Sequence, residues 1–286
     1  MLVLGVVDAL VLGVLGLLVG SFLNVVIHRL PKMMELRWAA ECEAFQTAPG
    51  AAPVEPVAQP TFNLVLPRSR CPHCDHQIRW FENVPVVSYL VLKGKCGHCG
   101  APISARYPSV ELLSAALFAW CGWHWGMTWP ALAWSGFSAA VLALAFIDWD
   151  TTLLPDDITL PLLWVGLCAS ALGWTDTLLP DALWGAVAGY LSLWLVYWAF
   201  KLVTGKEGMG YGDFKLFAAF GAWFGWSALI PVILMASLIG AVVGIAIKIR
   251  GQLREGGYVP FGPFLAVAGL TAMVFGPSSI LATLGL

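Results

Sequence analysis

The chain has 286 residues, of which 59% are apolar and only 11% are charged, and its mean hydropathy is +0.80. A soluble domain has about 45–50% apolar and about 25% charged residues. This composition excludes a conventional cytosolic protein, a secreted disulfide scaffold and a disordered chain. The net charge of −2 gives no indication of nucleic-acid binding. We therefore expect a polytopic membrane protein.

Long unbroken apolar runs predict membrane-spanning helices, because barrel strands alternate in polarity over about ten residues. The range 214–228 is short and contains two glycines, so a tilted or partly re-entrant helix is an alternative there. The range 2–27 has neither a basic start nor a small-residue cleavage site, which favours a first span or signal anchor over a signal peptide. The predicted spans are about eight: 2–27, 109–127, 130–147, 158–174, 182–200, 214–228, 231–249 and 260–282.

In an eight-span arrangement every basic residue falls on one side of the membrane. Basic loops face the cytoplasm in membrane proteins, so we expect these loops inside and both termini outside. The predicted domains are the first helix (1–27), a cytoplasmic loop domain (28–108) and a membrane-embedded domain of about seven helices (109–286). Within the loop, residues 48–60 are rich in Pro and Ala and are typical of a linker. The fifteen basic residues are Arg29, Lys32, Arg37, Arg68, Arg70, Arg79, Lys93, Lys95, Arg106, Lys201, Lys206, Lys215, Lys248, Arg250 and Arg254.

Four of the seven cysteines form two Cys-x-x-Cys knuckles, Cys71 with Cys74 and Cys96 with Cys99, separated by 21 residues. Each knuckle can chelate a metal ion from a tight turn, and two knuckles complete a tetrahedron of thiolates. A site closed by four cysteines holds structural rather than catalytic zinc. The expected fold class is therefore an all-α polytopic membrane protein with one small zinc-binding cytoplasmic domain.

Other interpretations of the cysteines remain open at this point. Two disulfides or a thioredoxin-like redox pair would use the same spacing, although disulfides are rare on the cytoplasmic side. A histidine inside a knuckle, His73 or His98, can replace one cysteine as a ligand. The single cysteines are expected to be packing residues; they are Cys42, Cys121 and Cys168.

Acidic residues outside the large loop are few and unevenly placed, and two groups of them lie on the side assigned to the cytoplasm. One group follows the third span, and the other is Asp213, which follows two glycines at the start of the sixth. Carboxylates at a membrane boundary are costly and usually functional. When two carboxylates share a site, only one ionises easily, so one serves as base towards water and the other as acid towards a carbonyl. The first group comprises Asp148, Asp150, Asp156 and Asp157.

The same carboxylates have simpler interpretations. Asp213 can be a helix N-cap, and Asp150, Asp156 or Asp157 can cap the fourth span or lie in water. A proton-coupled transporter would also carry carboxylates near its helix ends. A non-catalytic assembly scaffold would need no catalytic residues. The residues alone do not decide among these interpretations.

Four motifs between residues 20 and 263 resemble the type IV prepilin peptidases, a family of membrane aspartic proteases. The first is the stretch 20–31, GSFLNVVIHRLP, at the end of the first span. The second is the pair of knuckles followed by RYPSVE at 106–111. The third is Asp148 with Leu-Pro-Asp at 154–156, and the fourth is the Gly-x-Gly-Asp motif of 210–213.

This resemblance implies that Asp148 and Asp213 are the catalytic pair, with Asp150, Asp156 and Asp157 as alternatives for the first position. It implies that Cys71, Cys74, Cys96 and Cys99 bind zinc. The expected substrates are type IV prepilins and type II secretion pseudopilins, which are cut after a glycine at the end of a short basic leader. The enzyme is then expected to methylate the new amino terminus, usually Phe, with S-adenosylmethionine as donor. The expected location is the bacterial inner membrane among lipid, with the active site facing the cytoplasm and without nucleic-acid partners. The sequence predicts no residues for the methyl-donor site.

Overall fold

The computed structural model describes residues 2–46, 62–251 and 259–283, and this part of the chain is helical without a β-sheet. The predicted linker at 48–60 lies outside the described residues. The helices are α1 (Leu2–Gln46), α2 (Val87–Val91), α3 (Arg106–Trp125), α4 (Trp129–Thr151), α5 (Asp156–Ala171), α6 (Leu179–Thr204), α7 (Tyr211–Phe224), α8 (Leu229–Ile249), α9 (Gly262–Phe275) and α10 (Pro277–Thr283). Two short 3-10 turns, η1 (Trp80–Asn83) and η2 (Trp226–Ala228), complete the described elements.

Four of these helices are long and apolar enough to cross a membrane, namely α1, α4, α6 and α8. A fifth span results if α9 and α10, which meet at an angle of 107°, count as one. The prediction of a helical membrane protein is confirmed, whereas eight spans are not. The helices α5 and α7 have 16 and 14 residues, and a straight span needs about 20.

The first helix extends well beyond the predicted end at residue 27. It continues to Gln46, and Pro31 lies within it. Residues 32–46 consist largely of good helix formers such as Met, Leu, Glu, Arg and Ala, which continue the helix once it has begun. The first part of the predicted loop is therefore helical rather than irregular.

Small residues bring α1 and α3 into close contact. A Cβ atom added to Gly16 would lie 2.8 Å from the Cα atom of Ala115, and one added to Gly20 would lie 2.7 Å from the Cα atom of Glu111. Such contacts let helices approach until their backbones touch, which is how helices gain packing energy in lipid. This contact fixes the first half of α1 against the start of α3.

The short helix α7 is surrounded by other helices and forms the centre of the core. Ten of its 14 residues are buried, among them Phe217, Phe220 and Trp223. The indole nitrogen of Trp223 donates a hydrogen bond to the carbonyl of Leu162 in α5 at 2.9 Å. The apolar sequence of α7 is therefore explained by packing inside the protein, and not by contact with lipid.

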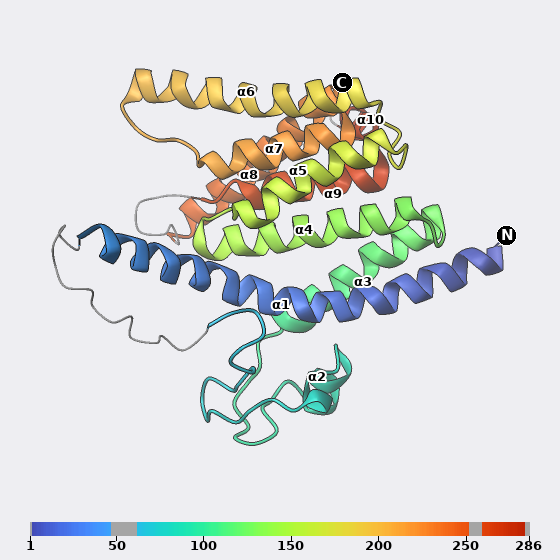
Figure 1. Cartoon of the computed structure of the whole chain (residues 1–286), viewed down its shortest axis with the longest axis vertical. Coiled ribbons are helices and arrows are strands. Elements are labelled where there is room, and N and C mark those ends of the chain that lie inside the picture. The colour runs from blue at the N-terminus through green and yellow to red at the C-terminus, as the bar shows by residue number, and fades with distance from the viewer. Residues whose placement is uncertain (1, 47–61, 252–258, 284–286) are drawn as a thin grey trace.

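Figure 1 shows that successive helices alternate in direction, so their ends meet at two opposite ends of the bundle. The last residues of α4 and α6 and the first residues of α5, α7 and α9 gather at the same end (Figure 1). Residues 62–105 form a small lobe against one side of α1 and contain the isolated bridges between Arg70 and Gln77 and between Lys95 and Pro102. This arrangement places the predicted aspartates at one end of the bundle.

Candidate active site

The two predicted catalytic aspartates lie at helix ends that meet in space. Asp148 is in the last turn of α4, and Asp213 is the third residue of α7. Both are buried, with 5% and 6% of their surface exposed. The carboxylate of Asp213 accepts a hydrogen bond from the backbone amide of Gly210 at 3.3 Å, in a position where the helix dipole stabilises negative charge.

The start of α9 supplies the hydrogen-bond donor to Asp148. The backbone amide of Gly262 donates to Oδ2 of Asp148 at 2.9 Å. A Cβ atom at position 262 would lie 2.6 Å from the same oxygen, so no larger residue fits without movement. The sequence analysis did not identify Gly262. The available signal was a glycine flanked by Phe and Pro at the start of the last apolar segment.

The two carboxylates form one site. Asp148 and Asp213 are near enough to interact electrostatically. The Oδ1 atom of Asp213 is buried and has no hydrogen-bond partner among the described residues. A buried polar atom without a partner is rare and needs a reason, such as a role in chemistry. A proton shared by the two carboxylates removes the repulsion between two buried negative charges.

The three alternative aspartates have different surroundings, since each forms an ion pair with a cation of the chain. Asp150 pairs with Arg106, Asp156 with Lys215 and Asp157 with Arg37. All three carboxyl groups are partly exposed. The distances are 2.7 Å for Arg106–Asp150, 2.6 Å for Lys215–Asp156 and 3.7 Å for Arg37–Asp157. Asp148, in contrast, is buried next to Asp213. These contacts favour Asp148 as the partner of Asp213.

The glycine that precedes Asp213 allows α7 to begin close to the connection between α4 and α5. A Cβ atom at Gly212 would lie 2.6 Å from the Cβ atom of Leu154. Thr152 ends α4 in a left-handed conformation, with φ of 57°, and the chain then turns towards α5. The second glycine of the Gly-x-Gly-Asp motif is therefore required by close packing next to the carboxylate.

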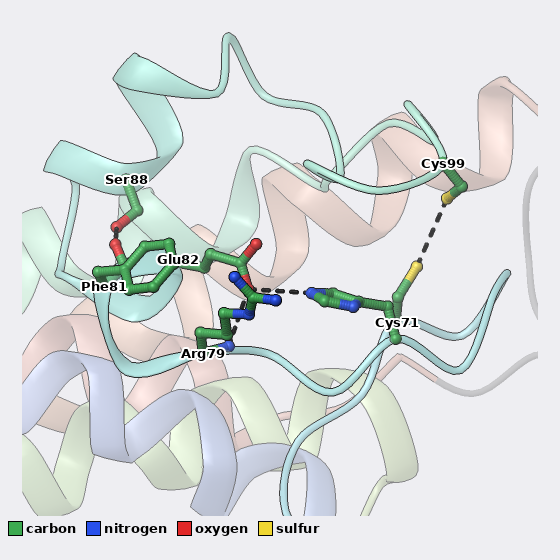
Figure 2. A network of polar contacts seen from close by, with 7 residues as sticks. Cys71, Arg79, Phe81, Glu82, Ser88 and Cys99 are labelled. Atoms are coloured by element: carbon green, nitrogen blue, oxygen red, sulfur yellow. Dashed lines mark hydrogen bonds and ion pairs between the residues drawn. The ribbon is translucent and has the colours of Figure 1, made fainter.

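The four predicted metal ligands converge in the lobe beside α1. The sulfur atoms of Cys71, Cys74, Cys96 and Cys99 all lie within 4.8 Å of one another. Those of Cys71 and Cys99 are 3.9 Å apart (Figure 2). Zinc bound tetrahedrally at about 2.3 Å separates its sulfur ligands by about 3.8 Å. The four thiols therefore fit a zinc ion, and no histidine belongs to this group among the described residues.

The two knuckles have the same backbone structure. The amide of Asp75 donates to the carbonyl of Cys71 at 3.0 Å, and the amide of Gly100 donates to that of Cys96 at 2.9 Å. The fourth residue after the first cysteine has a positive φ in both knuckles. Amides of Cys99 and then His98 hold the pKa of the Cys96 thiol down at about 6. These amides point at sulfur, as is typical of a metal-binding turn.

A polar network links the knuckles to the rest of the lobe. Glu82 accepts a hydrogen bond from the amide of Arg79 at 2.8 Å, and it contacts the ring of His76 at 3.2 Å (Figure 2). The amide of Arg79 is the main reason that the pKa of Glu82 is lowered. The ring of His76 stacks on that of His98 from the other knuckle, with centroids 5.2 Å apart. The histidines therefore join the two halves of the lobe.

The prediction for the single cysteines is confirmed for one of them. Cys121 is fully buried in the core, as expected of a packing residue. The other two, Cys42 and Cys168, are exposed, so the packing role predicted for them is wrong. Cys42 lies on the extension of α1 beyond residue 27, which the sequence analysis did not predict as helix.

Comparison with known proteins supports the same motifs. Residues 14–125 match the bacterial peptidase A24 N-terminal domain, and residues 135–245 match the type IV leader peptidase family. The chain belongs to the type IV leader peptidase family. This membership decides against the transporter and the non-catalytic scaffold. No solved structure matches the chain.

Several curated relatives are similar along almost their whole length, and each is named prepilin leader peptidase/N-methyltransferase. The protein from Stutzerimonas stutzeri is 55% identical over 264 residues, which cover 92% of this chain and 89% of the relative. The protein from Pseudomonas aeruginosa is 56% identical over 262 residues, covering 92% and 88%. A Burkholderia pseudomallei protein is 52% identical over 263 residues, covering 92% and 84%.

We predict that Gly262→Ala slows leader cleavage by about 10²-fold, because the added methyl group displaces the Asp148 carboxylate from its position. The measurement is the rate of cleavage of a purified prepilin in detergent. Gly244→Ala in α8 is the matched control, since a Cβ atom there meets nothing within 4 Å. Cleavage at the normal rate by Gly262→Ala would show that this contact does not position Asp148.

We also predict about one equivalent of zinc per chain in the purified protein, measured by mass spectrometry of the metal content. Cys71→Ser should lower the zinc content strongly, because three thiolates leave the site open. Cys168→Ser, which changes an exposed cysteine outside the cluster, should leave it unchanged. Less than about half an equivalent in the native protein, with all four thiols free to react, would contradict the tetrathiolate site.

Proposed function

We propose that Asp148 and Asp213 together cleave the leader peptide of type IV prepilins and pseudopilins. Family membership makes this chain a leader peptidase and N-methyltransferase. The observation that carries the residue assignment is the burial of two interacting carboxylates at one end of the bundle. Three points are our proposals: the identity of the catalytic residues, the side of the membrane that the site faces, and the residues that bind the metal.

The chemistry follows from a single proton held by two carboxyl groups. The ionised carboxylate takes a proton from water, whose oxygen then attacks the carbonyl carbon of the last leader residue, a glycine. The protonated carboxyl group gives its proton to the carbonyl oxygen. When the tetrahedral species collapses, the first carboxyl group gives the nitrogen the proton that it took from water, and the C–N bond breaks. A hydroxyl group on the carbon returns a proton to the second carboxylate. The products are a leader with a carboxyl terminus and a mature chain with a free amino terminus.

The place of the site suits a substrate that is itself partly in the membrane. The mature part of a prepilin begins with an apolar helix, so the scissile bond reaches the enzyme at the boundary of the bilayer. Asp150, Asp156 and Asp157 are partly exposed around the buried pair. A short basic leader reaches the buried pair past these polar side chains.

The amine released by cleavage is the acceptor for methyl transfer. S-adenosylmethionine supplies a methyl group bound to a positively charged sulfur. The protein's part is to hold the new amino terminus near the donor and to keep its nitrogen unprotonated.

We further propose that the site faces the cytoplasm of the bacterial inner membrane. The carboxylates lie at the end of the bundle where Lys201, Lys215 and Lys248 also lie, and basic residues mark the inner face. We also propose that the chain has three domains, 1–27, 28–108 and 109–286; helix α1 continues from the first domain into the second. The zinc ion stabilises the lobe and takes no direct part in proteolysis.

The deciding experiment is cleavage of a prepilin by Asp148→Asn and Asp213→Asn, with mass spectrometry of the mature amino terminus. Each variant should lose at least about 10²-fold in rate, because each removes one partner of the proton transfer. Asp157→Asn is the matched control, since it changes an exposed carboxylate whose ion pair contributes little. Cleavage at the normal rate by either of the first two variants would overturn the assignment.

A further inference from the structure

A large cavity lies between α1 and the lobe of residues 62–105, on the side of the molecule away from α6. Its volume is about 640 Å³, and residues of α1, the lobe and the start of α3 line it. Sites for small ligands usually have about 300–1,000 Å³. A more open hollow of 860 Å³ shares Arg29 with this cavity, but no residue of α3 lines it. Cleavage uses neither space.

One wall of the cavity is a polar stripe along α1. Asn24, His28 and Lys32 are four residues apart and therefore lie on one face of the helix. The amide group of Asn24 donates to the carbonyl of Tyr107 at 3.1 Å, and the ammonium group of Lys32 lies 3.1 Å from the ring nitrogen of His28. This wall offers hydrogen-bond donors and a positive charge.

The opposite wall carries a buried carboxylate. Glu111 in α3 is 8% exposed and lines the cavity. One of its oxygens accepts a hydrogen bond from the amide of Val86 at 2.8 Å, which fixes the side chain in place. The side chain of Ser21 in α1 also bonds this carboxyl group, so Glu111 joins α1 to α3 and the lobe, and cleavage gives it no role. Two aromatic rings, Tyr89 and Tyr107, also line the space.

These walls match the groups of one ligand that the family's second activity requires. S-adenosylmethionine carries a carboxylate, an ammonium and a sulfonium cation, a ribose and an adenine ring. The fixed carboxylate of Glu111 can pair with the cationic groups of this ligand, and Lys32 can pair with its carboxylate. The tyrosine rings can stack on its adenine ring. We propose that this cavity is the binding site of S-adenosylmethionine, with Glu111 facing the cationic part and Lys32 binding the carboxylate. The inference rests on the methyl-transfer half of the proposed function.

The position of the cavity suits a second step after cleavage. His28 on its wall interacts electrostatically with both Arg106 and Asp150, which form an ion pair at 2.7 Å. Arg106 at the start of α3 thus links this wall of the cavity to the end of α4, the helix that also carries Asp148. Two proposed zinc ligands, Cys71 and Cys96, also line the cavity, which gives the zinc a role in maintaining its shape.

The test measures binding of S-adenosylmethionine to the purified full-length protein in detergent, by isothermal titration calorimetry. Glu111→Gln and Lys32→Met should each raise the Kd at least about tenfold, the loss expected for one charge-assisted contact. Both should still cleave a prepilin, which shows that they are folded. Glu35→Gln on the exposed extension of α1 is the matched control and should bind normally.

A second measurement locates the ligand directly. Ultraviolet cross-linking of radioactive S-adenosylmethionine, followed by peptide mapping, should label peptides from 21–32 or 86–111. Unchanged Kd values in both cavity variants, or labelling confined to other peptides, would overturn the site. If the native protein cleaves but neither binds nor methylates, the methyl-transfer half of the proposed function fails together with the site. If the native protein methylates normally and the Glu111→Gln and Lys32→Met variants bind S-adenosylmethionine as it does, only the proposed binding site is refuted.

Discussion

The structure depends on the burial of two carboxyl groups at the ends of α4 and α7. Carboxylates in an apolar protein at a membrane boundary are costly, and they persist only with hydrogen bonds, proton sharing or a use. Asp148 has the amide of Gly262, and Asp213 has the amide of Gly210. One oxygen of Asp213 has no partner among the described residues. The cost of burial is thus retained at the pair for which we propose the activation of water.

Much of the surrounding architecture serves this arrangement. The short helix α7 is held at the centre of the bundle by aromatic packing, and Gly185 and Gly221 bring its backbone against α6. Gly212 lets the start of α7 approach Leu154, and Gly262 lets the start of α9 approach Asp148. Glycine occurs at these positions because backbone and carboxylate must come closer than a side chain allows. The remaining nearby acids are neutralised by cations of the same chain.

The sequence was informative wherever the signal is local. The small number of charged residues indicates a membrane protein. The spacing of Cys71, Cys74, Cys96 and Cys99 predicts a cluster that the structure confirms. The two glycines of the Gly-x-Gly-Asp motif indicate Asp213. The membership of the family is confirmed. The catalytic roles of the aspartates remain predictions, although the structure brings Asp148 and Asp213 together.

The features that were missed depend on contacts between distant segments. Gly262 and Asp148 are 114 residues apart in the sequence, so no local sequence pattern predicts the hydrogen bond between them. Hydropathy does not distinguish a helix buried in protein from one in lipid, so it predicts a membrane span at 214–228, where the structure has the buried helix α7. The extension of α1 was read as a loop because its polar residues resemble one, although they are good helix formers. The cavity beside α1 arises only when the lobe folds back on the helix.

Placing both activities at one end of the bundle gives a simple order of events. In the proposed mechanism the buried pair releases an amine, and the proposed donor site beside α1 receives it. The lobe that carries the four cysteines then serves the second step through the wall of the cavity, and the first step depends on the bundle alone. In this account the shared proton of Asp148 and Asp213 is the central claim.

That claim is tested most directly by the rate of leader cleavage by the native protein across a wide pH range, measured in single turnovers. A pair that needs one ionised and one protonated carboxyl group predicts a bell-shaped profile, since acid protonates the base and alkali removes the acid's proton. A rate that rises with pH to a plateau and never falls would contradict the shared proton.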